Sequence, residues 1–221
     1  TLRAEFPDVW FENCSSGGGR LDLGMMARFD CNWPSDISDP VDRIFIHDSY
    51  LTLFPANTMV TWVSEKDWHR RSLPLEYKFD VCMAGALGIG CDISKWNKDQ
   101  RQLAKNKIAQ YKRIRNTIQK GNINRLISPH DEARSIIQYT DKDHKNAVVF
   151  VYNLAEYPAS TVPDAQRSPL VRLRSLNPGS NYQIKGIKGN FSGEYLMNTG
   201  IAFPVNGAYR SGVFEITVAT K

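Results

Sequence analysis

Short apolar runs alternate with segments of helical spacing along the first 120 residues, which is typical of repeated β–α units. Three apolar runs predict strands, at residues 9–11, 25–29 and 59–64, and each is followed by polar residues. Between the second and third runs, Asp39 precedes Pro40. This pair predicts a helix start, because Asp caps helices and Pro suits the first helical position.

The clearest helix is predicted from about residue 97 to residue 120. Ala104, Ile108 and Tyr111 recur at intervals of three and four, and Lys and Arg residues fill the remaining positions. Gly121 follows as a stop signal. The pattern indicates an amphipathic helix packed on a larger body, with its basic face in water.

After Gly121 the pattern changes to period two, which indicates strands at residues 148–153, 171–174 and 214–218. Turn signals such as Asn177-Pro178-Gly179 separate these runs. We therefore predict two domains. Residues 1–121 form an α/β domain, and residues 122–221 form an all-β domain, an antiparallel β-sandwich.

Composition excludes several classes of protein. The chain is 42% apolar and 23% charged, as in ordinary globular proteins, and no run approaches the roughly 18 to 20 apolar residues of a membrane helix. The net charge of +5 is spread along the chain, so neither a nucleic-acid nor a membrane partner is expected. The sequence leaves the compartment open, between the cytoplasm and a secreted or periplasmic location in a microbe.

Motifs for cofactors and metals are also missing. The four Cys and four His residues lack zinc-ligand spacing, and neither dinucleotide nor phosphate-loop glycine patterns occur. We expect no metal and no cofactor. A nucleophile elbow of the G-x-S-x-G type is absent too, which argues against that class of serine hydrolase.

Polar groups follow the predicted strands, where parallel α/β proteins carry their active sites. Cys14 leads into a run of Ser and Gly, whose backbone N–H groups can approach a ligand closely. Asp36 and Asp39 follow Trp33, and an aromatic neighbour can keep a carboxyl protonated for general acid catalysis. The structural alternatives remain open: a flexible glycine turn, a helix cap at Asp39, and a surface ion pair between Asp36 and Arg43.

Two motifs taken together resemble glycoside hydrolase family 36, the microbial α-galactosidases. Residues 12–22 follow the pattern E-x-C-x-x-G-G-x-R-x-D, and residues 33–39 follow W-x-S-D-x-x-D with Arg43 four residues later. The similarity continues to about residue 128. It implies the last strands and helices of a (β/α)₈ TIM barrel, followed by a terminal β-sandwich.

The resemblance also implies a retaining mechanism on terminal α-D-galactosyl residues. Asp36 then corresponds to the general acid/base. Cys14 and the backbone from Ser15 to Gly17 are expected near the 2-position of the sugar, and Trp33 is expected to wall the pocket. The resemblance favours structural roles for other polar residues of these motifs, namely Arg20, Asp22, Asp39 and Arg43.

The family's nucleophile motif, K-W-D-x-N, is absent. Residues 95–99 look similar but begin the long predicted helix, so we reject them as the nucleophile. We therefore expect the C-terminal part of a larger glycosidase, inactive alone. Three barrel strands without neighbours leave unpaired edges, so we expect a homo-oligomer or association with the missing N-terminal part.

Departures from the family pattern leave the substrate open. Residues 26–32 lack the usual tyrosines, and Trp62 stands where the family commonly has His. The alternatives are an α-N-acetylgalactosaminidase of the same family and a non-catalytic carbohydrate-binding module. In each case the expected partner is a galactoside or a related oligosaccharide.

Overall fold

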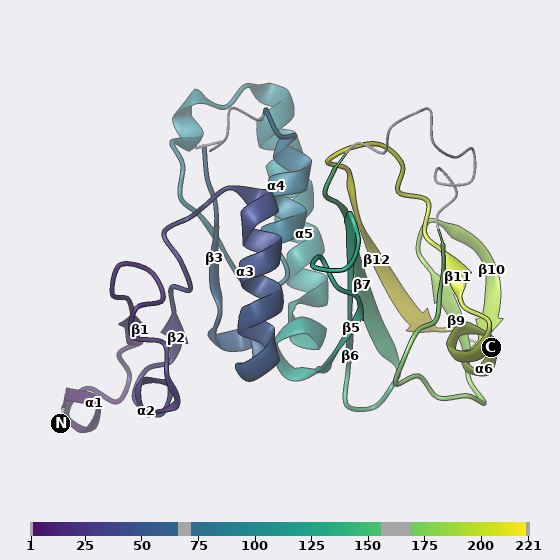
Figure 1. The fold of residues 1–221 in the computed structure, drawn as a ribbon, viewed down its shortest axis with the longest axis horizontal. Coiled ribbons are helices and arrows are strands. Elements are labelled where there is room, and N and C mark those ends of the chain that lie inside the picture. The colour runs from purple at the N-terminus through teal and green to yellow at the C-terminus, as the bar shows by residue number, and fades with distance from the viewer. Residues whose placement is uncertain (1, 66–71, 156–168, 220–221) are drawn as a thin grey trace.

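The computed structural model describes residues 2–65, 72–155 and 169–219. Parallel strands, a layer of helices and an antiparallel sheet follow one another across the molecule (Figure 1). The first part contains, in chain order, α1 (Leu2–Glu5), β1 (Glu12–Asn13), α2 (Leu23–Met26), β2 (Cys31–Asn32), α3 (Pro40–Leu53), η1 (Ala56–Thr58), β3 (Val60–Val63), α4 (Leu75–Cys82), β4 (Ala86–Ile89), η3 (Ile93–Lys95) and α5 (Lys98–Lys120).

Four short strands make up the parallel layer. β1 pairs with β2 and β3 pairs with β4, both parallel, while a bridge between Asn32 and Met59 joins the two pairs. This arrangement is consistent with the predicted part of a barrel, and it has four strands where the sequence predicted three. β4 was missed because Gly88 within it weakens the strand signal.

Two strand predictions in this part were placed wrongly. The run at residues 25–29 does not form a strand: it contributes to α2 and the turn that follows, because the Asp22 carboxylate caps this helix by accepting from the Met25 N–H at 2.9 Å. The strand comes later, as β2. The first strand likewise begins at Glu12, after the apolar residues 9–11.

Both helix predictions are confirmed. α3 begins at Pro40, and the buried Asp39 side chain accepts hydrogen bonds from the backbone N–H groups of Val41 and Asp42. At the start of α5, Asn97 and Gln100 form a reciprocal capping box. α5 ends at Lys120, one residue before Gly121.

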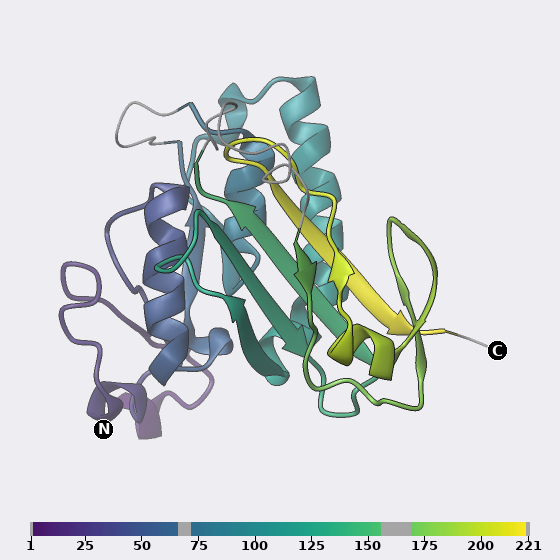
Figure 2. The same cartoon turned by 45° about the vertical axis from the view of Figure 1, so that its right-hand side comes forward.

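The second part is built on a six-stranded antiparallel sheet in the order β10-β9-β12-β7-β6-β5, beside a two-stranded sheet. Figure 2 shows its green and yellow strands against the teal helices. The elements are β5 (Asn122–Ile127), β6 (Arg134–Thr140), β7 (Asn146–Asn153), β8 (Leu170–Val171), β9 (Asn181–Ile184), β10 (Ile187–Ser192), α6 (Gly193–Asn198), β11 (Ile201–Ala202) and β12 (Ser211–Val218).

Both faces of this sheet are covered, which explains why β6 and most of β7 are buried. One face packs against β8, β11 and α6 in a core that includes Val149 and Leu196. The other face shares a core with the helices, in which Tyr111 and Phe150 both take part. The predicted sandwich is therefore present in part, since its second sheet has only two short strands.

A buried ion pair within the first part is linked to the second part by a hydrogen bond from β12. The Asp80 carboxylate of α4 lies 2.7 Å from the Lys107 ammonium of α5, and the Ser211 hydroxyl of β12 donates to it at 2.7 Å. The Asp80 side chain is only 1% exposed. Such a buried pair fixes the relative position of its elements, because losing one partner leaves a buried charge.

Among the described residues, no helix has the length and apolar character needed to cross a bilayer.

Candidate active site

The parallel strands have a helix-covered face and an open face. On β3, the Thr61 hydroxyl donates to the Cys82 carbonyl of α4, and Val63 packs into the core beneath that helix. Because side chains alternate along a strand, Trp62 projects from the opposite face. This open face corresponds to the interior of a barrel. The sequence predicted the active site at the carboxyl ends of these strands.

The loop after β1 is a tight, internally bonded turn. The Ser15 N–H donates to the Gly17 carbonyl at 3.1 Å, and the Gly19 N–H donates to the Ser15 carbonyl at 3.0 Å. The Arg20 guanidinium donates to the Cys14 carbonyl at 2.6 Å and holds both ends of the loop together. Cys14 itself is exposed and is a free thiol. The glycine run is therefore a defined turn with an accessible cysteine at its start.

This turn lies directly against the backbone that carries Asp36. Gly17 has φ +76°, and a Cβ there would lie 2.7 Å from the Ser35 Cα and 2.8 Å from the Asp36 nitrogen. Only glycine fits this conformation and this approach. The pairing of β1 with β2 aligns the two loops, since the Trp33 N–H donates to the Asn13 carbonyl at 3.0 Å. The loops of Cys14 and Asp36 thus meet at one end of the strands.

Asp36 is held by Trp33. The indole Nε1–H donates to the Asp36 Oδ1 at 2.9 Å, and the carboxyl is exposed on the open face. The sequence-based expectation of a carboxyl shielded by its aromatic neighbour is therefore not met in this chain. Trp33 contacts the carboxyl through a polar N–H at the ring edge and leaves the second oxygen directed away from that bond.

Arg43 packs against the face of the Trp33 ring. Its guanidinium lies 4.2 Å from the centre of the Trp33 ring, and its Nη2 donates to the Ser35 carbonyl at 2.6 Å. Burial lowers the pKa of Arg43 to about 10, although the charge of Asp36 acts in the opposite direction. Arg43 thus remains a cation at neutral pH. It contacts the Trp33 ring and the Ser35 backbone, and it makes no ion pair with Asp36 of the kind considered from the sequence.

His47 lies one helical turn from Arg43 and is fully buried. Burial and the neighbouring positive charge of Arg43 lower the pKa of His47 to about 3. Its Nε2 has no hydrogen-bond partner among the described residues. The folded protein therefore holds this ring neutral, whereas an unfolded chain protonates it below its usual pKa of about 6.5.

We predict an acid-sensitive stability from this histidine. The free energy of unfolding is unaffected by His47 above about pH 6.5 and falls by about 2 kcal/mol between pH 7.5 and pH 5, because the unfolded state then binds an extra proton. His47→Gln removes this loss, as measured by urea denaturation of the full chain at both pH values. His130→Gln, at an exposed histidine, is the matched control and leaves it in place. Equal pH dependence with and without His47 contradicts the prediction.

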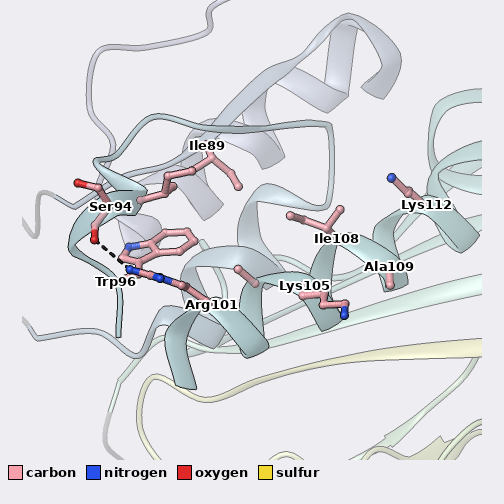
Figure 3. A pocket seen from close by; sticks show the side chains of 10 residues that line it. Ile89, Ser94, Trp96, Arg101, Lys105, Ile108, Ala109 and Lys112 are labelled. Carbon is pink, nitrogen blue, oxygen red and sulfur yellow. Dashed lines mark hydrogen bonds between the residues drawn. The ribbon is translucent and has the colours of Figure 1, made fainter. Parts of the chain in front are cut away.

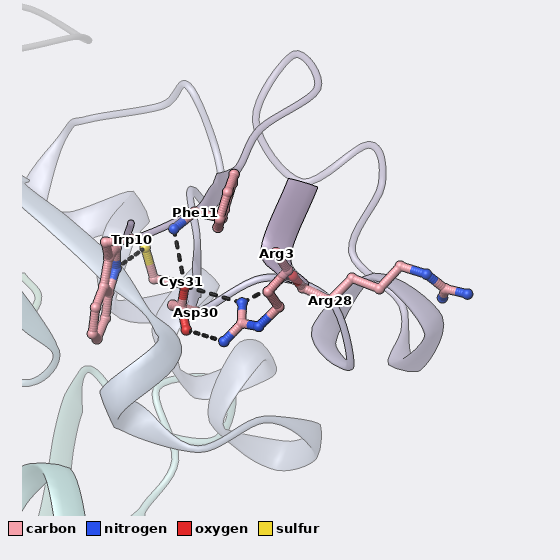
Figure 4. Close-up of polar contacts among 6 residues, drawn as sticks. All are labelled: Arg3, Trp10, Phe11, Arg28, Asp30 and Cys31. Carbon is pink, nitrogen blue, oxygen red and sulfur yellow. Dashed lines mark hydrogen bonds and ion pairs between the residues drawn. The ribbon is translucent and has the colours of Figure 1, made fainter. Parts of the chain in front are cut away.

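The segment before β1 is tied to the turn before β2 (Figure 4). The Arg3 guanidinium forms an ion pair with Asp30 at 2.6 Å, and the Asp30 carboxylate also accepts from the Phe11 N–H at 2.9 Å. The hydrogen bond from Arg3 lowers the pKa of Asp30. The Trp10 indole donates to the Cys31 sulfur at 3.1 Å. These contacts fix the position of β1 beside β2.

Residues 95–99, which resemble the nucleophile motif, lie elsewhere in the fold. They span the end of η3 and the first turn of α5, where Trp96 is buried and packs against Phe79. The Asn97 side chain is used in the helix cap. This placement agrees with the sequence-based decision to reject these residues as the nucleophile.

Family comparisons identify the chain. The Melibiase family model matches residues 1–121, and the model of the glycosyl hydrolase family 36 C-terminal domain matches residues 134–216. The chain belongs to glycoside hydrolase family 36. The resemblance stated from the sequence motifs is therefore confirmed.

The chain is also similar to individual members of family 36. The probable α-galactosidase G of Aspergillus terreus is 32% identical over 217 residues, covering 96% of this chain and 29% of the relative. α-Galactosidase AgaA of Geobacillus stearothermophilus is 33% identical over 218 residues, covering 96% and 28%. A crystal structure of an AgaA variant in complex with raffinose matches with a TM-score of 0.91 at 28% identity, covering 99% and 30%. The chain thus spans less than a third of these relatives.

The structure brings the predicted site residues together. Cys14, Ser15 and Gly17 form one loop, Trp33 and Asp36 form the next, and the two loops touch through Gly17. Sequence reasoning singled out Trp62 as a departure that leaves the substrate open, but it did not assign this residue to the site. Its ring centre lies 4.7 Å from that of Trp33. The available signal was a tryptophan at the carboxyl end of a predicted strand.

Proposed function

We propose that this chain supplies the acid/base part of a retaining α-galactosidase that hydrolyses terminal α-D-galactosyl residues. The observation that carries the proposal is the contact between the Gly17 turn and the Asp36 backbone, with the Asp36 carboxyl held by the Trp33 N–H. Family membership supports it, as does the raffinose complex of the related AgaA enzyme.

Asp36 acts twice in this proposal. In the first step a carboxylate nucleophile attacks the anomeric carbon, and the protonated Asp36 gives its proton to the departing glycosidic oxygen. In the second step the Asp36 carboxylate takes a proton from water, which attacks the anomeric carbon and releases the nucleophile. The nucleophile comes from barrel strands outside residues 1–221, because the family's nucleophile motif is absent from this sequence.

The glycone is assigned to the loop after β1. The exposed Cys14 side chain and the backbone from Ser15 to Gly17 contact the galactosyl ring near its 2-position, and Trp33 forms part of the pocket wall. Backbone groups in a rigid glycine turn suit this task, since they approach sugar hydroxyls without intervening side chains.

The remaining barrel strands are assigned to the free edge of β4. No strand pairs with β4 on the side away from β3 among the described residues, and unpaired strand edges favour association. A groove of about 830 Å³ lies beside this edge and is lined by β4, η3 and α5 (Figure 3). Its lining includes Ile89, Ile93 and Ile108 and the cations Arg101, Lys105 and Lys112.

The occupant of this groove is a helix from the β–α units that complete the barrel in the same enzyme. A parallel strand added to β4 continues the sheet, and its neighbouring helix then packs beside α5. The groove fits a helix with an apolar stripe and acidic flanks, because the groove is apolar with three cations in its lining. We also keep the division into residues 1–121 and 122–221 as part of this proposal.

The substrate is tested in the full-length enzyme in which these residues lie. We expect hydrolysis of 4-nitrophenyl α-D-galactoside and raffinose. We expect at least about hundredfold lower kcat/KM on 4-nitrophenyl α-N-acetylgalactosaminide, since a larger 2-substituent meets the Gly17 turn. The reverse preference assigns the enzyme to α-N-acetylgalactosaminides, and no turnover of either substrate contradicts the proposed function.

A further inference from the structure

Trp62 is the large side chain on the open face of the parallel strands for which the mechanism above has no use. It lies near the carboxyl end of β3. Trp62 is 44% exposed, although its neighbours Thr61 and Val63 are fully buried. Thr61 and Val63 face the helices, so Trp62 faces the barrel interior. An exposed tryptophan at the active-site end of a barrel strand is a candidate substrate contact.

A glycine within β4 and another directly after it make room for the Trp62 ring. Trp62 pairs with Gly88, where a Cβ would lie 2.6 Å from the indole Cδ1. At Gly90 a Cβ would lie 3.0 Å from the indole Cε3. The indole therefore lies across the bare backbone of β4. A side chain at position 88 has no space unless the indole moves.

Trp62 also contacts the residue that holds the proposed acid. The Trp33 and Trp62 ring centres are 4.7 Å apart with the rings inclined at 39°, and the Trp33 N–H donates to Asp36. The carboxyl thus lies next to a continuous surface of two indoles on one side. On its other side lies the Gly17 turn, which contacts the Asp36 backbone.

This order along the sheet suggests which part of a substrate meets Trp62. The glycosidic oxygen must lie within hydrogen-bond reach of Asp36, between the two sugars that it joins. With the galactosyl ring on the side of the Gly17 turn, the leaving-group sugar lies on the side of Trp62. The C–H face of a pyranose is apolar and fits the face of an aromatic ring.

We propose that Trp62 is a specificity-determining residue that stacks against the leaving-group sugar of an α-galactoside. The assignment rests on the function proposed above. The surface proposed for stacking is made by the Trp62 ring, which lies over the glycines at positions 88 and 90 and contacts Trp33.

The test compares two substrates in the full-length enzyme. Raffinose carries a sugar as its leaving group, whereas α-D-galactosyl fluoride carries a single atom. Trp62→Ala lowers kcat/KM for raffinose about tenfold and leaves kcat/KM for the fluoride unchanged, because only raffinose contacts the missing ring. Trp62→Phe, which keeps an aromatic face, loses less than Trp62→Ala on raffinose.

Two further variants distinguish loss of the Trp62 contact from a general loss of folding or activity. Gly88→Ala keeps Trp62 but displaces its ring, so it gives the same selective loss on raffinose even if Trp62→Ala fails to fold. Tyr195→Ala removes an aromatic ring of similar exposure, 43%, from α6, and leaves both substrates unaffected. Equal losses on both substrates, or no loss on either, overturn the assignment.

The function proposed above is checked separately with Asp36→Asn on the same substrates. A selective loss with Asp36→Asn but none with the Trp62 and Gly88 variants overturns only the role of Trp62. Full raffinose activity in Asp36→Asn overturns the acid/base assignment and, with it, the basis for the stacking proposal.

Discussion

Asp36→Asn in the full-length enzyme lowers kcat/KM for raffinose roughly 10²- to 10⁴-fold, the usual contribution of a general acid. Asparagine has the shape of aspartate and its amide oxygen still accepts from the Trp33 N–H, so the loop keeps its structure. What is lost is the proton for the glycosidic oxygen. The measurement is steady-state kinetics on raffinose beside α-D-galactosyl fluoride.

The two substrates separate the two roles of Asp36. Fluoride departs without a proton, so the first step survives in the variant and a burst of released fluoride is expected. The second step is then slow, because water is no longer deprotonated. Added azide restores turnover, since this nucleophile needs no base.

A neighbouring carboxylate supplies the control. Asp42 lies in the first turn of α3, six residues from Asp36, and Asp42→Asn retains activity on both substrates. If Asp36→Asn and Asp42→Asn behave alike on raffinose, Asp36 is not the acid. If the 221-residue chain binds galactose in a calorimetric titration with an affinity that Asp36→Asn leaves unchanged, and the full-length enzyme shows no turnover, the chain is a binding module.

Local signals predicted the helices well because their causes are local. α3 and α5 each begin at a side chain that caps its own backbone, Asp39 and Asn97, and such contacts span only two or three residues. The loop motifs were likewise visible, because the turn from Cys14 to Gly19 is closed by its own hydrogen bonds.

The strands were harder, because pairing with distant residues decides them. Residues 25–29 are apolar enough for a strand, yet Asp22 caps a helical turn there, while the two-residue β2 is held by its pairing with β1. β4 was missed as a strand because it contains Gly88, and glycine is unfavourable in strands. The glycine is needed there because the Trp62 ring of the neighbouring strand leaves no space for a side chain.

The same limit applies to the site. The motifs indicated Asp36 and Cys14 together, but their contact through Gly17 depends on the parallel register of β1 and β2. No local signal connects Trp62 with Trp33, because 28 intervening residues separate them and only the bridge from Asn32 to Met59 brings the strands together.

We expect residues 1–221 by themselves to associate, and this is the second large effect. The edge of β4 is unpaired among the described residues, the groove beside α5 is apolar, and exposed apolar residues also surround β1. Phe6 is 50% exposed and Trp10 is 71% exposed. Light scattering of the isolated chain is therefore expected to report a dimer or larger species, whereas a monodisperse monomer contradicts the prediction.

Binding of the other barrel half identifies the occupant of the groove. Co-expressed with a polypeptide that carries the remaining strands, the chain forms a one-to-one complex that hydrolyses α-galactosides, although neither part is active alone. Ala109→Glu places a bulky negative charge at an exposed position of the groove and weakens this complex roughly hundredfold, because the new carboxylate loses water on docking and repels the acidic flanks expected of the docked helix.

Asn116→Glu is the matched control, since Asn116 is exposed on α5 outside the groove. It adds the same charge to the same helix and leaves the complex intact. If both variants assemble equally well, the groove is not where the other half docks. If Ala109→Glu disrupts only the self-association of the isolated chain, the groove serves a second copy, and the barrel is completed through the edge beside β1, where the apolar side chains of Phe6 and Trp10 are exposed.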